Sequence, residues 1–443
     1  MNLIQRFVSL LFFVVFVVFL VIKGLKQDVQ DIEVPSEEYA RLSEDLKRLE
    51  RLLALENKDL EDVRGKLEML EKSRPNEVHK EGRGPWNKPI AVLIFTCNRA
   101  DAVKVLIDKL QKARTSPEQF HLIVSQDCDD VSVKKAVEEF GSNVTYVKHT
   151  SPKQAHIKIP ENQRRYRTYF YIARHYKLGL DYVFNERNYD SVIIVEDDLD
   201  ISPDFFSYFS GTRWLLDDDP TLYCISAWND NGKAQLIDME AHDLLYRSDF
   251  FPGLGWMMTN NLWKELGPNW PAGFWDDWIR DPARRKDRQC IRPEISRTAM
   301  TDFGKKGASE GLFFNHYLKK IILNNKTVDF TQKDHSQLLS EAYLKSFVAK
   351  VYALPRISIN DFLLLNEKGG AYRVEYFSMQ EYTDHTRKIK VMGDTKAGVP
   401  RTAYRGIVTA FIRGKRLYLA PADRNFKGYD KDWEAPQDIL DGS

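Results

Sequence analysis

Residues 191–198 have the sequence SVIIVEDD, and this segment gives the clearest indication of the fold. Its first five residues are uncharged and mostly β-branched, which is typical of a strand buried on both faces of a parallel sheet. Three acids, Glu196, Asp197 and Asp198, follow without a break. Because open parallel sheets bind their ligands outside the carboxyl ends of the strands, we expect these acids to face a ligand.

Short apolar runs and helical periods alternate on the N-terminal side of this stretch. Strands are predicted at residues 90–96 (IAVLIFT), 121–126 (HLIVSQ) and 144–147 (VTYV). Apolar residues recur at helical spacing in residues 103–110, 131–140 and 169–184. The alternation predicts right-handed βαβ units and an α/β fold with a doubly wound, mostly parallel sheet.

The four cysteines all lie after residue 90, in the large C-terminal part of the chain. Cys97 and Cys128 come just after the first two predicted strands, which should be neighbours, so a disulfide between them is geometrically reasonable. Cys224 and Cys290 would then pair by elimination. Four cysteines allow three pairings, so this choice depends on the strand argument alone.

The acidic triplet is a candidate metal site. Carboxylates that converge at one strand end repel one another unless a cation neutralises them, and hard divalent cations prefer oxygen ligands. A diphosphate could complete the ligand shell, and the metal would then stabilise negative charge on a departing nucleotide. The alternative interpretation of the triplet by itself is a solvated acidic turn.

Six strings together resemble a known family. They are VEDDLDISPDFFSYF from residue 195, CISAWNDNGK from 224, YRSDFFPGLGW from 246, GFWDDW from 273, IRPEISRT from 291 and YRGIV from 404. They are similar to the α-1,3-mannosyl-glycoprotein β-1,2-N-acetylglucosaminyltransferases of glycosyltransferase family 13, over residues 90–432. The resemblance implies a GT-A fold, a UDP-N-acetylglucosamine donor, Mn²⁺ and inversion at the sugar C1. The implied acceptor is the terminal α-1,3-linked mannose of an oligomannose N-glycan.

The resemblance also implies roles for individual residues. Asp198 matches the direct metal ligand, and Glu196 and Asp197 match acids that flank the donor and the metal. Residues matching those that hold the nucleotide are Arg99, Asp127 and His175. A carboxylate can accept the imide N–H of uracil, which suits Asp127 to that role. From the residues alone, His175 would be interpreted as a packed core histidine, since it lies in an aromatic-rich helix.

The glycine-rich, basic segment Gly304–Gly311 is a candidate diphosphate loop. Its backbone N–H groups and the Ser309 hydroxyl could bind phosphate oxygens. Ser309 matches a donor-binding serine of the family. The chain has extra residues at 299–302 relative to the family pattern, which leaves the course of this loop open.

An inverting transfer needs a base for the acceptor hydroxyl and no enzyme nucleophile. Asp276 and Asp277 stand between Phe274, Trp275 and Trp278, an apolar setting that we expect to raise the pKa of a base toward neutrality. The alternative is a surface acidic pair beside buried tryptophans. The family match favours Asp276 as the base, whereas spacing does not separate it from Asp277.

The N-terminal region predicts a membrane anchor and a stem. Residues 1–6 form a short tail, and residues 7–22 are uncharged and long enough to cross a thin bilayer as a signal anchor. A cleaved signal peptide is the alternative, but the exit lacks a small-x-small pattern. Residues 23–88 form the stem, in which a short heptad run at 42–70 could pair with a second copy as a homodimer or remain a single helix.

The position of the cysteines and of sequons at Asn143 and Asn325 favours a lumenal location for the globular part. With the family, this predicts a single-pass type II protein of the Golgi membrane. Residues 89–330 are expected to form the catalytic domain. Residues 331–443 are expected to form a smaller α+β C-terminal domain, with a hairpin around Gly414.

Charge excludes one class of partner and leaves others open. Lys and Arg number 65 against 64 Asp and Glu, so the formal charge of +1 gives no basic excess for nucleic acid. The resemblance leaves two alternative functions open. One is β-1,2-N-acetylglucosamine transfer to O-linked mannose, and the other is a non-catalytic Golgi paralogue that keeps the fold.

Overall fold

The computed structural model describes residues 86–306 and 312–434. The predicted anchor, the stem and Ser309 lie outside the described residues. Within them, no helix is both long and apolar enough to cross a membrane. All described residues belong to a single compact unit.

The centre of this unit is an eight-stranded sheet with the order β3-β2-β1-β4-β8-β6-β9-β7. Its strands are β1 (Ile90–Thr96), β2 (Phe120–Gln126), β3 (Val144–Lys148), β4 (Ser191–Glu196), β6 (Leu222–Ser226), β7 (Leu245–Ser248), β8 (Trp256–Thr259) and β9 (Gln289–Pro293). A two-stranded ribbon pairs β5 (Leu199–Ile201) with β10 (Thr298–Met300). The helices up to residue 316 are α3 (Ala100–Ala113), α4 (Val131–Glu138), α5 (Arg167–Asp181), α6 (Phe205–Thr212), α7 (Leu215–Asp218), α8 (Asn260–Leu266), α9 (Trp275–Arg280), α10 (Pro282–Arg285) and α11 (Leu312–His316).

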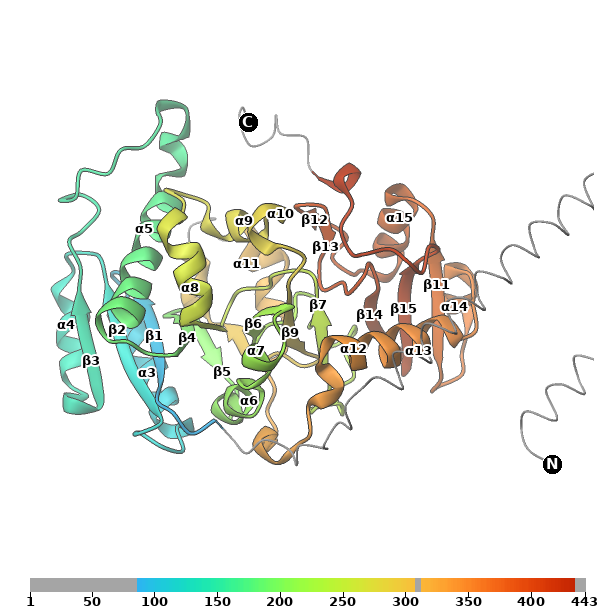
Figure 1. The fold of residues 1–443 in the computed structure, drawn as a ribbon, viewed down its shortest axis with the longest axis horizontal. Coiled ribbons are helices and arrows are strands. Elements are labelled where there is room, and N and C mark those ends of the chain that lie inside the picture. Colours follow the sequence, from blue (N-terminus) through green and yellow to red (C-terminus); the bar gives the residue numbers. More distant parts are fainter. Residues whose placement is uncertain (1–85, 307–311, 435–443) are drawn as a thin grey trace, which may run out of the picture. The chain divides into compact units, whose positions relative to one another are not determined.

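The parallel half of the sheet confirms the strands and helices predicted from the sequence. Strands β3, β2, β1 and β4 all run parallel to one another. Alternate residues of β1 enter two different cores, with Val92 on the side of α3 and α4 and Leu93 on the side of α5. Helices therefore cover both faces, as expected for a doubly wound sheet, and Figure 1 shows α5 beside β1 and β2.

The other half of the sheet is mixed, which the sequence did not predict. Strand β8 runs antiparallel to both β4 and β6, and β7 runs antiparallel to β9. Antiparallel pairing needs only a turn, whereas a parallel crossover needs a long connection. The turn into β8 passes through Gly253 and Gly255, whose φ angles of +68° and +89° favour glycine. The fold is thus α/β, with β3, β2, β1 and β4 parallel to one another on one side and β6 with β9 as a parallel pair within the mixed half.

Both predicted disulfides are present. Cys97 and Cys128 are paired across the ends of β1 and β2, with Cα atoms 4.9 Å apart. Cys224 and Cys290 join β6 to β9, with Cα atoms 4.6 Å apart. The described residues include no free cysteine.

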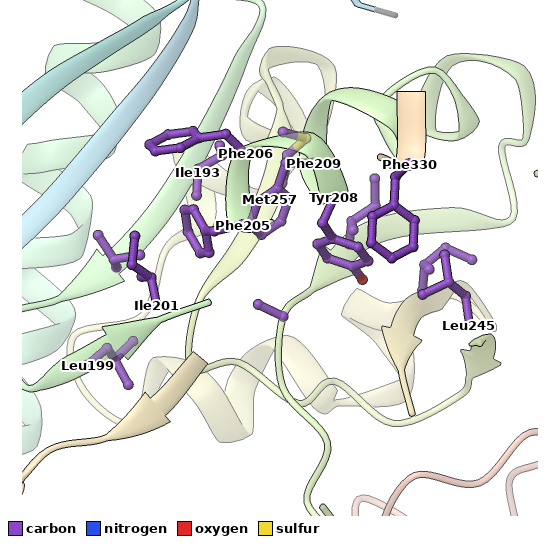
Figure 2. Close-up of a cluster of buried hydrophobic side chains, with 14 of the residues drawn as sticks. Ile193, Leu199, Ile201, Phe205, Phe206, Tyr208, Phe209, Leu245, Met257 and Phe330 are labelled. Atoms are coloured by element: carbon purple, nitrogen blue, oxygen red, sulfur yellow. The ribbon is translucent and has the colours of Figure 1, made fainter. Parts of the chain in front are cut away.

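An aromatic core lies beneath the middle of the sheet. Figure 2 shows helix α6 contributing Phe205, Phe206 and Phe209 to this cluster, with Ile193 of β4 and Met257 of β8 nearby. Burying a large aromatic side chain stabilises the folded state by about 1.5–3 kcal/mol. The cluster fixes β4, and therefore fixes the acidic triplet that ends it.

A second, three-stranded sheet has the order β11-β15-β14. Its strands are β11 (Ala371–Tyr376), β14 (Val408–Ile412) and β15 (Lys415–Pro421), and the pair β12 (Thr395–Lys396) and β13 (Val399–Pro400) lies apart from them. The helices of this region are α12 (Ser340–Tyr343), α13 (Ala349–Ala353), α14 (Ile359–Leu364) and α15 (Met379–Ile389). The hairpin predicted around Gly414 is confirmed, since Arg413 and Gly414 have φ of 50° and 78°, as a two-residue hairpin turn requires.

The second sheet is not packed as a separate body. Tyr418 of β15, and Tyr404 shortly before β14, belong to the same hydrophobic core as Val92 of β1 and Phe205 of α6. Phe347 joins the two regions, with its ring centroid 6.1 Å from Tyr246 of β7 and 5.8 Å from Tyr418 of β15. The division between residues 330 and 331 stays a prediction.

Candidate active site

The acidic triplet lies at the carboxyl end of the parallel strands and contacts one arginine. Arg99, which follows β1, forms ion pairs with Asp197 and, at 2.9 Å, with Asp198 Oδ2. Thr96 Oγ1 donates a hydrogen bond of 2.7 Å to Asp197 Oδ2. The structure therefore brings together three of the residues expected at the donor site.

The third acid, Glu196, is held from the other face of the sheet. Tyr176 of α5 donates a 2.7 Å hydrogen bond to Glu196 Oε1. Burial, and then repulsion by Asp198, raise the pKa of Glu196 to about 7. Burial also raises the pKa of Asp197 to about 6. The three carboxylates are thus short of positive charge, since Arg99 supplies a single cation.

A pocket of about 180 Å³ lies between Glu196 of this triplet and the GFWDDW segment. Glu196 and Asp276 both line it, and Asp277 is not among its described lining residues. Its walls are mostly apolar and aromatic, formed by Tyr169, Ile172, Phe251, Pro252, Gly253, Leu254, Phe274 and Trp275, with Arg280 as the cation. Aromatic walls with a few polar groups suit the faces and hydroxyls of a sugar.

Local backbone geometry places Asp276 in this pocket. Phe274 precedes α9 in the left-handed conformation, with φ 53°, and its ring stacks on Tyr169 at 5.0 Å. Trp275 stacks on Tyr176 at 4.2 Å between ring centroids. The turn and the two stacked rings fix where α9 begins, and so fix Asp276 in its first turn.

The expectation that an apolar setting raises the pKa of the base is wrong for Asp276. Desolvation would raise that pKa, but Arg280 lies 2.9 Å from Asp276 Oδ2 and outweighs it, so the pKa is lowered. Arg280 also contacts Asp277 Oδ1 at 3.2 Å, and Lys396 lies 3.3 Å from the same oxygen. Both aspartates therefore have cationic partners, and only Asp276 lines the pocket.

Asp127 and His175 meet at the end of β2. His175 Nδ1 lies 3.3 Å from Asp127 Oδ1, and both side chains are buried. Burial lowers the pKa of His175 well below its usual value and raises the pKa of Asp127 to about 6. His175 is thus buried, as a core histidine would be, but it also contacts the residue expected to bind uracil.

The segment that leads toward Ser309 begins against the acidic triplet. Thr301 donates two hydrogen bonds of 2.8 Å to the Asp198 carbonyl, from its backbone N–H and from Oγ1. Arg99 donates a 3.1 Å hydrogen bond to the carbonyl of Phe303, in the 3₁₀ turn Asp302–Lys306. The course of the loop at residues 307–311, including Ser309, is outside the described residues.

Sequence reasoning missed three residues that contact the proposed site residues. Thr96 and Tyr176 hold acids of the triplet, and Arg280 holds Asp276. For Arg280 a signal existed, because a cation four residues after an acid lies on the same face of a helix. Thr96 lies at the predicted end of its strand, where ligands are expected, although its side chain was given no role. Tyr176 offered no such signal among the many aromatic residues of its helix.

Comparison with known proteins identifies the family. The model of the GNT-I family matches residues 3–433. An Arabidopsis thaliana alpha-1,3-mannosyl-glycoprotein 2-beta-N-acetylglucosaminyltransferase is 36% identical over 381 residues, which cover 84% of each chain. The chain belongs to the GNT-I family. This confirms the resemblance found in the sequence.

Likenesses to solved structures are more distant. A mannosyltransferase from Pyrobaculum calidifontis, solved with GDP-Man and Mn²⁺, is 15% identical, covers 42% of this chain and 50% of its own, and gives a TM-score of 0.28. The glucosyl-3-phosphoglycerate synthase of Mycobacterium tuberculosis is 13% identical, covers 41% and 60%, and gives 0.25. Scores this low carry no inference about the metal or the donor of this GNT-I family member.

Proposed function

We propose that this protein transfers N-acetylglucosamine from UDP-N-acetylglucosamine, in β-1,2 linkage, to the terminal α-1,3-linked mannose of an oligomannose N-glycan. The observation that carries the proposal is the family match across almost the whole chain. The pocket supports it, because Glu196 of the donor-side triplet and Asp276, the proposed base, line one cavity with aromatic walls. The product would be the starting point for hybrid and complex N-glycans.

On the donor side, the residues present fit a divalent cation. Three carboxylates lie at one strand end against the single guanidinium of Arg99, and burial raises the pKa values of Glu196 and Asp197. We propose that Asp198 would hold Mn²⁺ and that Ser309 would bind the donor. When bound, the metal would supply positive charge for the departing diphosphate. Arg99, Asp127 and His175 would hold the nucleotide, with Asp127 accepting the imide N–H of uracil.

On the acceptor side, the proposed base is Asp276. It would take the proton of the attacking mannose hydroxyl, which a single-displacement, inverting reaction requires. Its pairing with Arg280 keeps it ionised, and so ready to accept a proton, even in a mildly acidic compartment. With Oδ2 contacted by Arg280, we propose Oδ1 as the atom that receives the proton.

The location follows from the family and from the N-terminal sequence. We propose a Golgi membrane protein of type II topology, anchored by residues 7–22, with the described residues in the lumen. Two disulfides in the described part support an oxidising compartment. Homodimerisation through the stem remains part of the proposal.

The test is an assay of the purified full-length protein with UDP-N-acetylglucosamine, with and without Mn²⁺. We expect transfer to an oligomannose N-glycan that depends on the metal, with a β-1,2 linkage in the product. Transfer only to an O-mannosyl peptide would favour the alternative acceptor. Binding of UDP without transfer to either acceptor would indicate a non-catalytic paralogue.

A further inference from the structure

Four polar side chains form a continuous chain of contacts behind the proposed uracil site. Ser125 Oγ, in the buried end of β2, lies 2.9 Å from His175 Nε2 and 3.0 Å from His149 Nε2. The other nitrogen of the His175 ring, Nδ1, lies 3.3 Å from Asp127 Oδ1. The contacts therefore run from His149 through Ser125 and His175 to Asp127.

Three different elements hold this chain of contacts in place. Ser125 belongs to β2, and His149 follows β3, where its backbone N–H donates a 2.8 Å hydrogen bond to the Gln126 carbonyl. His175 comes from α5, and its ring packs edge-on against Phe95 at 4.7 Å. Ser125 lies at a strand end where ligands are expected, but neither its side chain nor that of His149 was given a role, so their contacts behind the site call for an explanation.

The direction of these hydrogen bonds follows from the chemistry of neutral imidazole. Each neutral ring has one N–H and one lone pair. If His175 turned the Nδ1 lone pair toward the Asp127 carboxylate, two acceptors would face each other at 3.3 Å, so the N–H belongs on Nδ1. Nε2 then accepts from the Ser125 hydroxyl. A hydroxyl that donates its only hydrogen can still accept, and His149 Nε2–H is placed to donate to it.

We propose that His149 and Ser125 are positioning residues that lock His175 in the Nδ1–H tautomer and thereby keep Asp127 a pure hydrogen-bond acceptor. This rests on the proposed function, in which Asp127 accepts the imide N–H of uracil. Cytosine has a lone pair at the same ring position, so an acceptor-only Asp127 repels it. His149 would thus contribute to pyrimidine selectivity without touching the nucleotide.

Two variants of His149 separate this role from packing. His149→Gln keeps an N–H donor at the end of a side chain of similar reach, whereas His149→Leu fills the space with no donor. We expect His149→Leu to weaken UDP binding by about 3- to 10-fold, as for one lost hydrogen bond. The KM for UDP-N-acetylglucosamine should rise by a similar factor and kcat should stay within about twofold. The preference for UDP over CDP should fall, and His149→Gln should restore all three.

If UDP binding were weakened equally in the Gln and Leu variants, His149 would act through packing. If both variants bound UDP with wild-type affinity, His149 would have no role in nucleotide binding. Either result overturns the inference. If the wild-type protein bound no UDP, the proposed function itself would fail. This outcome is distinguishable from the others, because it is measured on the unaltered protein and not on the His149 variants.

A measurement on the unaltered protein is independent of the variants. Nitrogen-15 spectra of histidine-labelled protein report which ring nitrogen carries the proton, and Nδ1–H at His175 is expected. A proton on Nε2 of neutral His175 would overturn the proposal.

Discussion

Replacing Asp276 by asparagine tests the proposed chemistry most directly. The change keeps the size of the side chain and its contact with Arg280 while removing its proton affinity. Loss of a general base typically costs about 10²–10⁴-fold in rate. We therefore expect kcat to fall by that factor, with UDP binding preserved because Asp276 is not proposed to touch the nucleotide.

The structure supplies a matched control in Asp277→Asn. Asp277 shares Arg280 with Asp276 and also contacts Lys396, but it does not line the pocket. Its side chain is 32% exposed, and ion pairs of this kind contribute at most about 1 kcal/mol. The control should therefore change stability slightly and kcat by less than about tenfold.

Steady-state kinetics with an oligomannose acceptor, UDP titration calorimetry and thermal melting are run on both variants. Arg280 keeps one carboxylate partner in either variant, so both should fold. If Asp277→Asn were the severe variant while Asp276→Asn kept near-normal kcat, the two roles would have to be exchanged. If both were mild, the base would lie outside the GFWDDW segment.

Three further predictions concern metal, base recognition and folding. Asp198→Ala should abolish Mn²⁺-dependent turnover while leaving the melting temperature nearly unchanged. In the wild-type protein, calorimetry should show that Mn²⁺ and UDP bind cooperatively. If Mn²⁺ bound tightly without UDP and still did so after the substitution, the metal site would lie elsewhere. Burial raises the pKa of Asp127 to about 6, so its ionisation costs stability as pH rises from its unfolded value through about 6. Asp127→Asn should therefore stabilise the protein at neutral pH by roughly 1–3 kcal/mol while weakening UDP binding, and urea denaturation across pH checks this. Replacing Cys224 and Cys290 by alanine opens a link between residues 66 apart and should cost about 4 kcal/mol in the same assay, whereas a loss below about 1 kcal/mol would contradict the chain-entropy argument.

Local patterns were enough to predict the parallel half of the sheet. The run at residues 90–96 is β1 to the residue, because an uninterrupted apolar run ending at polar residues has few alternatives. The disulfide between Cys97 and Cys128 followed from the same strands. The mixed half could not be predicted in this way, because its antiparallel strands β7 and β8 are four residues long and depend on tertiary pairing.

The candidate site, too, could be predicted from the sequence only in part. Asp197 and Asp198 were found because strand ends of parallel sheets bind ligands, and Asp276 because of the family resemblance. The lowered pKa of Asp276 could not be predicted from aromatic neighbours, since it depends on the distance to Arg280. Ser125 lies at the end of a predicted strand, but its contact with His149 could not be predicted, because a serine of β2 and a histidine after β3 become partners only in the folded chain.

The shared core of the two sheets can close only late in the synthesis of the chain. Tyr404 and Tyr418 are among the last members of a core whose first buried member is Ile90, so these members leave the ribosome roughly 300 residues after the first. Until then, strands and aromatic side chains made early lack part of their cover, and the growing chain presents surface to which chaperones bind. Chain termination shortly before the hairpin at Gly414 would therefore leave a molecule that has every proposed catalytic residue and no closed core.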